Sequence, residues 1–374
     1  MRSVIWRWKL RRALLERCGL SLPFSRRRGS KKILLLSEHG EIPNAQIFPF
    51  FLYAKELADR YHVELRQFPL RRSFGGDSGG GVEPDAIVFQ SGFDLKTGEL
   101  ESLIERISSA WPHAQLAYFD WFAPADLRYA KTLNSHVAAY VKKQVFRDLA
   151  HYDRPTLGDT NLTDFYAGKY NIDLPQTHFQ VPAGFEQKLV LAAGFECSPV
   201  VLELIERPPK FGERSIDLHA RMSAKGPGWY GQMRREALAE VAKLQGRFQV
   251  TFDGFVARER YFAELRNSKL CFSPFGYGEV CWRDFEAMST GALLLKPDMA
   301  HLRLSQEFFR ANETYIPLSW DLSDLAEKVE YYVRNASKRE EIARNAFELM
   351  SNYYRQKVFL RDIEPLWGLL GVRS

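Results

Sequence analysis

The residues best suited to chemistry lie close together in the last third of the chain. Ser273 follows a short apolar run, and Gly276 and Gly278 allow the backbone to approach a ligand closely. Arg283 and Glu286 are three residues apart, so they share one face of a helix. An arginine pairs with phosphate, and a carboxylate accepts hydrogen bonds from ribose hydroxyls. The segment therefore indicates a site for a nucleoside diphosphate.

A helix is predicted directly after these glycines. It begins near Cys281 and ends at Gly291, because glycine readily takes the left-handed conformation that stops a helix. The start of a helix presents free N–H groups and the positive end of its dipole, and both favour an anion. Each feature taken alone is equally typical of a packed helix with surface charges. The combined order of strand, Ser-Pro, paired glycines, Arg-x-x-Glu-Ala and glycine-strand favours a binding site.

Two loops in the first half of the chain contain candidates for a general base. His39 follows the first predicted strand of this half, and Asp120 follows the fourth. The carboxyl ends of parallel strands border the ligand-binding crevice, so both loops are expected to face it. A histidine with a pKa near ~6.5 suits proton removal at neutral pH. Glu38 and Glu41 are weaker candidates, and structural roles for all four, or a reaction without such a base, stay open.

Short β-rich runs alternate with helical stretches along most of the chain. This alternation predicts parallel sheets with right-handed crossovers, the arrangement of a Rossmann-like domain. The charged, proline-containing segment 206–210 divides the alternation into two series. The expected fold class is therefore α/β, with two Rossmann-like domains facing each other across a cleft where the ligand binds.

The predicted elements and domains have the following bounds. In the first series, strands are expected at 33–37, 62–68, 86–90, 115–119 and 137–141, and helices at 49–60 and 97–110. In the second, strands are expected at 215–221, 248–252, 270–273 and 292–296, and helices at 229–244, 259–267, 282–290 and 321–335. The domains are a basic tail at 1–32, Rossmann-like domains at 33–207 and 208–337, and helices at 338–374 that pack back on the first domain.

The positive charge of the chain is concentrated at its amino terminus. Of 52 Lys and Arg residues against 46 Asp and Glu, residues 1–32 hold 11 basic residues and a single acid, Glu16. The rest of the chain has 41 basic and 45 acidic residues, so it lacks the broad positive surface that nucleic-acid binding needs. A nucleic-acid partner is therefore not expected.

The basic tail interleaves cations with Trp6, Trp8, Leu14 and Leu15. It lacks the apolar core of a secretion signal, so we expect it to be retained. This composition suits contact with an anionic membrane surface, near which each cation contributes about 1 kcal/mol. Arg11 interrupts the apolar arc of a helical wheel, and a solvated basic extension is therefore the alternative.

Composition and cysteine spacing exclude several classes of protein. The chain of 374 residues is 45% hydrophobic and 26% charged, as in globular proteins, and no apolar run approaches the ~20 residues of a membrane-spanning helix. Cys18, Cys197, Cys271 and Cys281 lie far apart and form no Cys-x-x-Cys pair. We therefore expect neither a disulfide scaffold nor a zinc ribbon. The expected location is the cytoplasm, either free or peripheral on the inner face of the membrane.

The segment around Arg283 resembles the donor-binding motif of GT-B-fold glycosyltransferases. The closest resemblance is to the exostosin-like branch and to relatives from bacterial surface-polysaccharide loci. Their Arg-x-x-Glu-Ala pattern, followed by a small residue, a glycine and an apolar strand, matches Arg283, Glu286, Ala287 and Gly291. The resemblance is strong over about residues 215–335 and weak over the amino-terminal half, which varies with the acceptor in such enzymes.

The resemblance also implies roles for individual residues. The stretch 218–226 is similar to a strand and loop whose Arg and Lys hold the donor diphosphate in many GT-B enzymes. Retaining members carry two glutamates one residue further apart than Glu279 and Glu286, so the sugar contact of Glu279 is open. The implied donor-binding residues are Arg221, Lys225, Ser273, Gly276, Gly278, Glu279, Arg283 and Glu286.

The activity that the resemblance implies is transfer of a sugar from a nucleotide-activated donor. The acceptor would be a glycan or lipid-linked glycan, in cell-surface polysaccharide or lipopolysaccharide synthesis. The nucleotide-sugar would be a co-substrate, and no other cofactor is implied. Metal-using glycosyltransferases commonly hold their cation with Asp-x-Asp, which this chain lacks, so no metal is expected.

Two other functions compete with this reading. A degenerate GT-B protein that acts as a binding or scaffold partner would keep the fold without the chemistry, although intact Arg283 and Glu286 weigh against it. A dinucleotide-dependent oxidoreductase would carry Gly-x-Gly-x-x-Gly after a strand, which is absent after 33–37 and 215–221. The glycine-rich stretch 75–81 lacks that spacing and is expected to be a surface loop.

Overall fold

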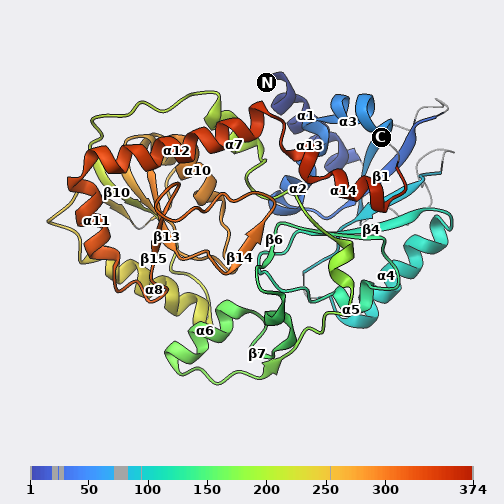
Figure 1. The fold of residues 1–374 in the computed structure, drawn as a ribbon, viewed down its shortest axis with the longest axis horizontal. Coiled ribbons are helices and arrows are strands. Elements are labelled where there is room, and N and C mark those ends of the chain that lie inside the picture. The colour runs from blue at the N-terminus through green and yellow to red at the C-terminus, as the bar shows by residue number, and fades with distance from the viewer. Residues whose placement is uncertain are drawn as a thin grey trace.

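Two α/β domains make up the chain, each built around its own parallel sheet (Figure 1). The computed structural model describes residues 2–18, 24, 29–70, 83–93, 95–252 and 254–372. The glycine-rich stretch 75–81 lies outside these ranges. Within them, no helix combines the length and the apolar character needed to cross a membrane.

The amino-terminal domain has a six-stranded sheet in the order β2-β1-β3-β4-β5-β9, with all neighbours parallel. The strands are β1 (Lys31–Ser37), β2 (Val63–Pro69), β3 (Ala86–Phe89), β4 (Gln115–Asp120), β5 (Ala139–Lys142) and β9 (Leu189–Leu191). The central strands are buried on both faces, which explains their continuous apolar runs. The five strands predicted here are confirmed, and β9 is an addition.

The helices of this domain follow the sequence less closely. α4 (Thr97–Ala110) has the predicted bounds. The single helix predicted at 49–60 is wrong, because α2 (Glu41–Leu52) and α3 (Ala54–Tyr61) meet at Tyr53. Most of α2 is buried, so its apolar residues lie on every side and leave no helical periodicity. Pro49 lies inside α2, where a proline removes one intrahelical hydrogen bond and its ring crowds the carbonyl oxygen four residues earlier.

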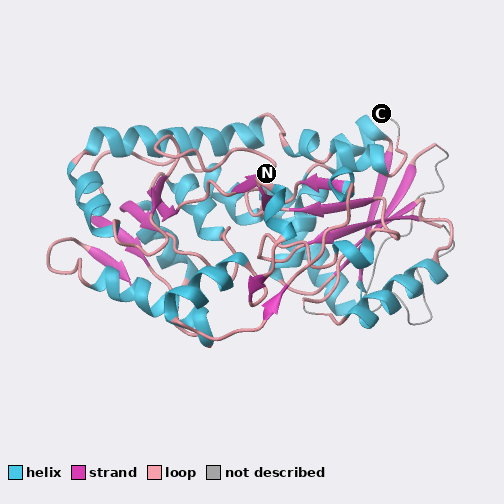
Figure 2. Cartoon of the chain, turned by 60° about the horizontal axis from the view of Figure 1, so that its bottom comes forward, coloured by secondary structure: helices cyan, strands magenta, loops and turns pink. Residues whose placement is uncertain are grey.

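The carboxyl-terminal domain repeats the same topology with five parallel strands, in the order β11-β10-β12-β13-β15. The strands are β10 (Ile216–Ala220), β11 (Val250–Phe252), β12 (Ser268–Phe272), β13 (Leu293–Pro297) and β15 (Ile316–Leu318). The helices are α8 (Gly228–Ala242), α9 (Arg258–Arg266), α10 (Trp282–Thr290) and α11 (Leu325–Arg334). Figure 2 shows the two sheets as separate sets of strands. The expected α/β class with two Rossmann-like domains is confirmed.

Shorter elements lie along the chain between β4 and β10. They are α5 (Ala130–Leu133), the 3₁₀ helices η2 (Leu149–Asp153) and η3 (Phe185–Lys188), strands β7 (Thr156–Leu157) and β8 (Gln176–Thr177), α6 (Asn161–Tyr170) and α7 (Pro199–Ile205). α6 reaches the second domain, where the ring of Tyr166 stacks on that of Trp229 of α8 at 5.7 Å.

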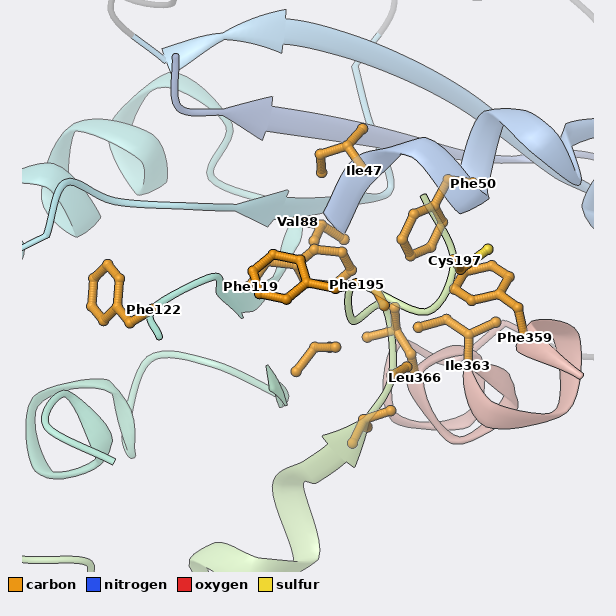
Figure 3. Close-up of a cluster of buried hydrophobic side chains, with 14 of the residues drawn as sticks. Ile47, Phe50, Val88, Phe119, Phe122, Phe195, Cys197, Phe359, Ile363 and Leu366 are labelled. Carbon is orange, nitrogen blue, oxygen red and sulfur yellow. The ribbon is translucent and has the colours of Figure 1, made fainter. Parts of the chain in front are cut away.

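Two further connections join the domains. β6 (Gln144–Phe146) pairs antiparallel with β14 (Leu302–Leu304), so a small sheet contains one strand from each domain. The chain then returns through α12 (Ala336–Arg355), α13 (Phe359–Asp362) and α14 (Glu364–Leu369). Figure 3 shows Phe359, Ile363 and Leu366 packed with Phe50 of α2, and the rings of Phe50 and Phe359 lie 5.1 Å apart.

The basic tail is not a solvated extension over its described residues. Arg2–Cys18 form the helix α1, which lies beside α2. Trp8 is 4% exposed, and its ring lies 5.5 Å from those of Phe48 and Phe51. The guanidinium of Arg11, which interrupts the apolar arc, lies 3.7 Å from the centroid of Phe51. α1 is therefore docked on the amino-terminal domain.

Candidate functional site

A cleft of about 1290 Å³ lies between the two domains. From the amino-terminal side it is lined by residues of α1, by the start of α2 and by α7. The opposite side consists of the loops after β10, β11 and β12 together with α9 and the start of α10. The loops after β10 and β12 follow the two strands between which the strand order of the carboxyl-terminal sheet reverses, the usual position of a ligand site in a doubly wound domain.

Arg283 and Glu286 both line this cleft, as their spacing predicts. One carboxylate oxygen of Glu286 accepts a 2.8 Å hydrogen bond from the phenol of Tyr261 on α9. Burial raises the pKa of Glu286, and the Tyr261 hydrogen bond and the charge of Arg283 oppose that rise. The second oxygen, Oε1, has no hydrogen bond to a described residue that would fix it. A ligand hydroxyl can therefore bond to it.

Arg283 is held from one side. Its Nη2 donates to the carbonyl oxygen of Arg221, which fixes the guanidinium next to the loop after β10. Its Nε is buried and has no hydrogen-bond partner among the described residues. Buried N–H groups are nearly always paired in native proteins, so an unpaired one in a cleft points to a ligand with an acceptor oxygen.

Arg221 and Lys225 also line the cleft, but they differ in their surroundings. The guanidinium of Arg221 is engaged by Glu264 of α9, with Nη2 and Oε1 2.9 Å apart and Nε donating to Oε2. The hydrogen bond from Arg221 is also the main reason that the pKa of Glu264 is lowered. Lys225 is exposed in the loop after β10. Of these two cations, Lys225 is thus the one that can reach a phosphate without breaking a bidentate ion pair.

Ser273 does not line the cleft. It is fully buried, and its hydroxyl donates a 2.6 Å hydrogen bond to Asp284 of α10. The other oxygen of Asp284 accepts from the N–H of Cys281 at 2.8 Å and lies 3.1 Å from Nζ of Lys296 on β13. Ser273 therefore helps to fix the start of α10, and its expected role as a donor ligand is corrected to a supporting one.

The two loop glycines face different partners. Gly276 lines the cleft, and its N–H bonds to the carbonyl oxygen of Gly278 at 3.0 Å. A Cβ on Gly278 would lie 2.1 Å from the carbonyl oxygen of Ala123, so this glycine permits close contact with the amino-terminal domain. We expected Gly278 to let the backbone approach a ligand. In the structure it lets the backbone approach the amino-terminal domain instead.

Glu279 is fully buried outside the cleft lining. Neither of its carboxylate oxygens has a hydrogen-bond partner among the described residues, and Oε1 lies 3.9 Å from Nε2 of His301. Glu279 thus does not line the cleft, and its contact with the donor sugar stays a prediction.

The two leading candidates for a general base lie away from the cleft. His39 is exposed and does not line it. Asp120 is fully buried, and its Oδ2 accepts hydrogen bonds of 2.6 Å from both Lys142 and Tyr140. A carboxylate with these partners cannot take a proton from an acceptor hydroxyl. Glu41, at the start of α2, is the candidate that lines the cleft.

Sequence reasoning missed two groups at the site. Arg234 of α8 lines the cleft, and it donates to the carbonyl oxygens of Ser223 (3.0 Å) and Phe275 (3.1 Å), so it joins the loops after β10 and β12. Glu203 of α7 also lines the cleft and pairs with Lys9 of α1 at 3.3 Å. Neither residue belongs to a sequence motif. Their position at the cleft follows only from their contacts in three dimensions.

Two buried titratable groups lie beside the wall of the cleft. The amine of Lys143 donates to the carbonyl oxygen of Trp121 at 3.0 Å and lies 4.3 Å from the centroid of Phe195. The Phe195 ring packs against Trp282, which lines the cleft. Burial lowers the pKa of Lys143 to about 7 and raises the pKa of Glu196 to about 7. Both groups therefore change charge near neutral pH.

Within the part of the chain that the structure describes, no three His, Cys, Asp or Glu side chains are grouped so that they could hold a metal ion. The described cysteines Cys197, Cys271 and Cys281 are free thiols. The positive groups that line the cleft, among them Lys225 and Arg283, can offset negative charge on a ligand.

Comparisons with known proteins give one family match and a set of similar solved structures. Residues 213–363 match a family model described as glycosyl transferase-like. No match is found among the curated proteins. Similar solved structures include HepE of Anabaena in complex with UDP, with 12% identity, a TM-score of 0.47, and coverage of 90% of this chain and 100% of that one. Another is a glycosyltransferase of Rickettsia africae, with 11% identity, a TM-score of 0.49, and coverage of 92% and 100%.

Proposed function

We propose that this chain, a glycosyltransferase with the GT-B fold and a glycosyl transferase-like domain at residues 213–363, transfers a sugar from a nucleotide-activated donor to a glycan or lipid-linked glycan. The observation that carries the proposal is the start of α10 at the cleft. There Arg283 offers a buried N–H without a described partner, and Glu286 offers a carboxylate on the same helical face. This pair suits the phosphate and ribose of one nucleotide.

In this proposal the diphosphate lies at the amino-terminal end of α10. The helix dipole favours an anion there, and so do the first-turn N–H groups that the capping box of Cys281 and Asp284 does not use. Arg283 and Lys225 add positive charge, and Arg234 joins the loop that carries Lys225 to the loop that leads into α10. Negative charge grows on the departing nucleoside diphosphate, so preorganised cations stabilise the transition state more than the ground state. We propose that they replace a divalent metal.

Glu286 binds the ribose in this proposal. Its oxygen that is not bonded to Tyr261 can accept a hydrogen bond from a ribose hydroxyl. A hydrogen bond to a charged group contributes about 1.5–3 kcal/mol, which is enough to orient the nucleotide. Tyr261 in turn fixes the carboxylate, so the nucleotide does not have to order it on binding.

The acceptor lies on the amino-terminal side of the cleft in this proposal. Glu41 at the start of α2 and Glu203 of α7 are carboxylates of that domain that line the cleft. Because Glu203 pairs with Lys9 and Arg258, Glu41 is our candidate for removing a proton from the acceptor hydroxyl. The reaction would belong to cell-surface polysaccharide or lipopolysaccharide synthesis. It would take place in the cytoplasm at an anionic membrane surface, which the tail contacts.

Thermal unfolding with UDP, GDP, CMP and NAD tests the proposed function. A nucleotide that occupies the site at 100 times its Kd raises the free energy of unfolding by about 2.7 kcal/mol. We expect UDP or GDP to stabilise the chain and NAD to have no effect. Stabilisation by NAD alone would favour an oxidoreductase, and no stabilisation by any nucleotide would favour a scaffold without donor binding.

A further inference from the structure

The helix α1 presents three different faces. Ile5, Trp8 and Leu15 are each 4% exposed and pack on the amino-terminal domain. Lys9 and Arg12 line the cleft. A third set, which we call the outward stripe, consists of Trp6, Leu10 and Leu14 and is 64%, 44% and 45% exposed.

The outward stripe forms a continuous apolar row. Its members are four residues apart, so they lie one above the other on a single helical face. At about 100° per residue, this face points away from the side where Trp8 packs on α2. Large apolar side chains exposed in a row on one helix mark a surface that has a partner.

The charges beside the stripe indicate what that partner is. Arg7 is exposed next to Trp6, and Lys9 follows on the other flank. The first 32 residues contain 11 basic residues and only Glu16 as an acid. Apolar side chains flanked by cations are typical of a helix that lies in the interface of an anionic bilayer. A second protein surface would not require this charge surplus.

The opposite rim of the cleft has a matching feature. Phe255 follows β11, lines the cleft and is completely exposed, at 102% of the reference area. α1 and the Phe255 loop therefore border the same cleft from different domains. A surface that contacted both of them would cover the opening of the cleft.

We propose that the outward stripe of α1, together with Phe255, docks the chain on an anionic bilayer so that the cleft opens toward the membrane. This inference rests on the proposed function, and it specifies that the acceptor is presented at the bilayer surface. The stripe enters the interface between headgroups and acyl chains, and Arg7 stays at the level of the lipid phosphates.

The test is sedimentation of the full chain with vesicles. One set contains equal parts of phosphatidylglycerol and phosphatidylcholine, and the other contains phosphatidylcholine alone. We expect the wild-type chain to bind the anionic set more strongly, and binding to weaken as salt is added. The triple variant Trp6→Gln, Leu10→Gln and Leu14→Gln should bind the anionic vesicles at least about tenfold more weakly than the wild type. It loses the apolar contact and keeps every charge.

The matched control is Tyr331→Gln, which removes an exposed aromatic side chain (51% exposed) from α11 in the other domain. This variant should bind vesicles as the wild type does. The inference would be overturned if the triple variant bound the vesicles as strongly as the wild type, or if the wild type bound neither set of vesicles. So would a dimer in sedimentation velocity that the triple variant abolishes, since a second copy would then occupy the stripe.

Nucleotide binding in vesicle-free buffer separates this inference from the proposed function. A chain that binds a nucleoside diphosphate but no vesicles overturns the docking surface alone. A chain that binds vesicles but no nucleotide overturns the proposed function and leaves the docking surface standing.

Discussion

Arg283→Ala should lower kcat by about 10²–10³ while KM for the donor changes much less. The guanidinium lines the cleft at the start of α10, and its Nε has no partner among the described residues. It is therefore positioned for charge that appears on the leaving diphosphate in the transition state. Steady-state kinetics with the nucleotide-sugar measures both constants, and Arg283→Lys should recover part of kcat because it keeps the charge.

Arg258→Ala is the matched control. Arg258 also lines the cleft, but it is about half exposed and pairs with Glu203 at 3.2 Å. Its removal should change kcat by less than about tenfold, as expected for a screened surface pair. A variant of Arg283 that raises KM and leaves kcat intact would contradict transition-state stabilisation, because the lost interaction would then be one of ground-state binding.

Asp120→Asn should destabilise the fold by about 3–5 kcal/mol, because it leaves a buried lysine without its counter-charge. The Nζ of Lys142 lies 2.6 Å from Asp120 Oδ2, and both side chains are completely buried. The same oxygen accepts from Tyr140, and Oδ1 accepts from the N–H of Phe122 at 2.9 Å. Urea unfolding monitored by circular dichroism gives the change in the free energy of unfolding.

Two further variants distinguish the structural role of Asp120 from a catalytic one. Asp120→Asn combined with Lys142→Met should recover part of the lost stability, because no unpaired charge remains. Glu364→Gln breaks an exposed pair with Arg60 and should cost less than about 1 kcal/mol. If Asp120→Asn unfolds like the wild type but has no activity, Asp120 is a catalytic base and the structural role is wrong.

The alternation of strand-like and helical runs in the sequence was enough to predict two Rossmann-like domains. Each domain repeats the same pattern of buried strands followed by helices. The bounds of α4 and α10 match the prediction at both ends. In α10, Gly291 takes φ 73°, the left-handed conformation expected at the end of a helix. The small sheet of β6 and β14 was not predictable, since its strands are three residues long and belong to different domains.

The site was predictable only where spacing along one helix decides the geometry. Arg283 and Glu286 share a helix, so their joint position at the cleft follows from three residues of separation. The surroundings of Arg221 depend on Glu264, 43 residues away, and those of Asp120 on Lys142 from a neighbouring strand. Glu279 is buried near His301, 22 residues away, and residue types and local spacing do not reveal this burial.

Calorimetric titration in EDTA tests the central claim, that the start of α10 holds the nucleotide of the donor without a metal. The titrant is the nucleoside diphosphate that stabilises the wild type. Wild type should bind it, Glu286→Ala should bind it more weakly by about 1.5–3 kcal/mol, and Glu203→Ala, on the opposite wall, should bind it as the wild type does. Equal affinity for Glu286→Ala, or wild-type binding that appears only when Mg²⁺ or Mn²⁺ is added, would contradict the account.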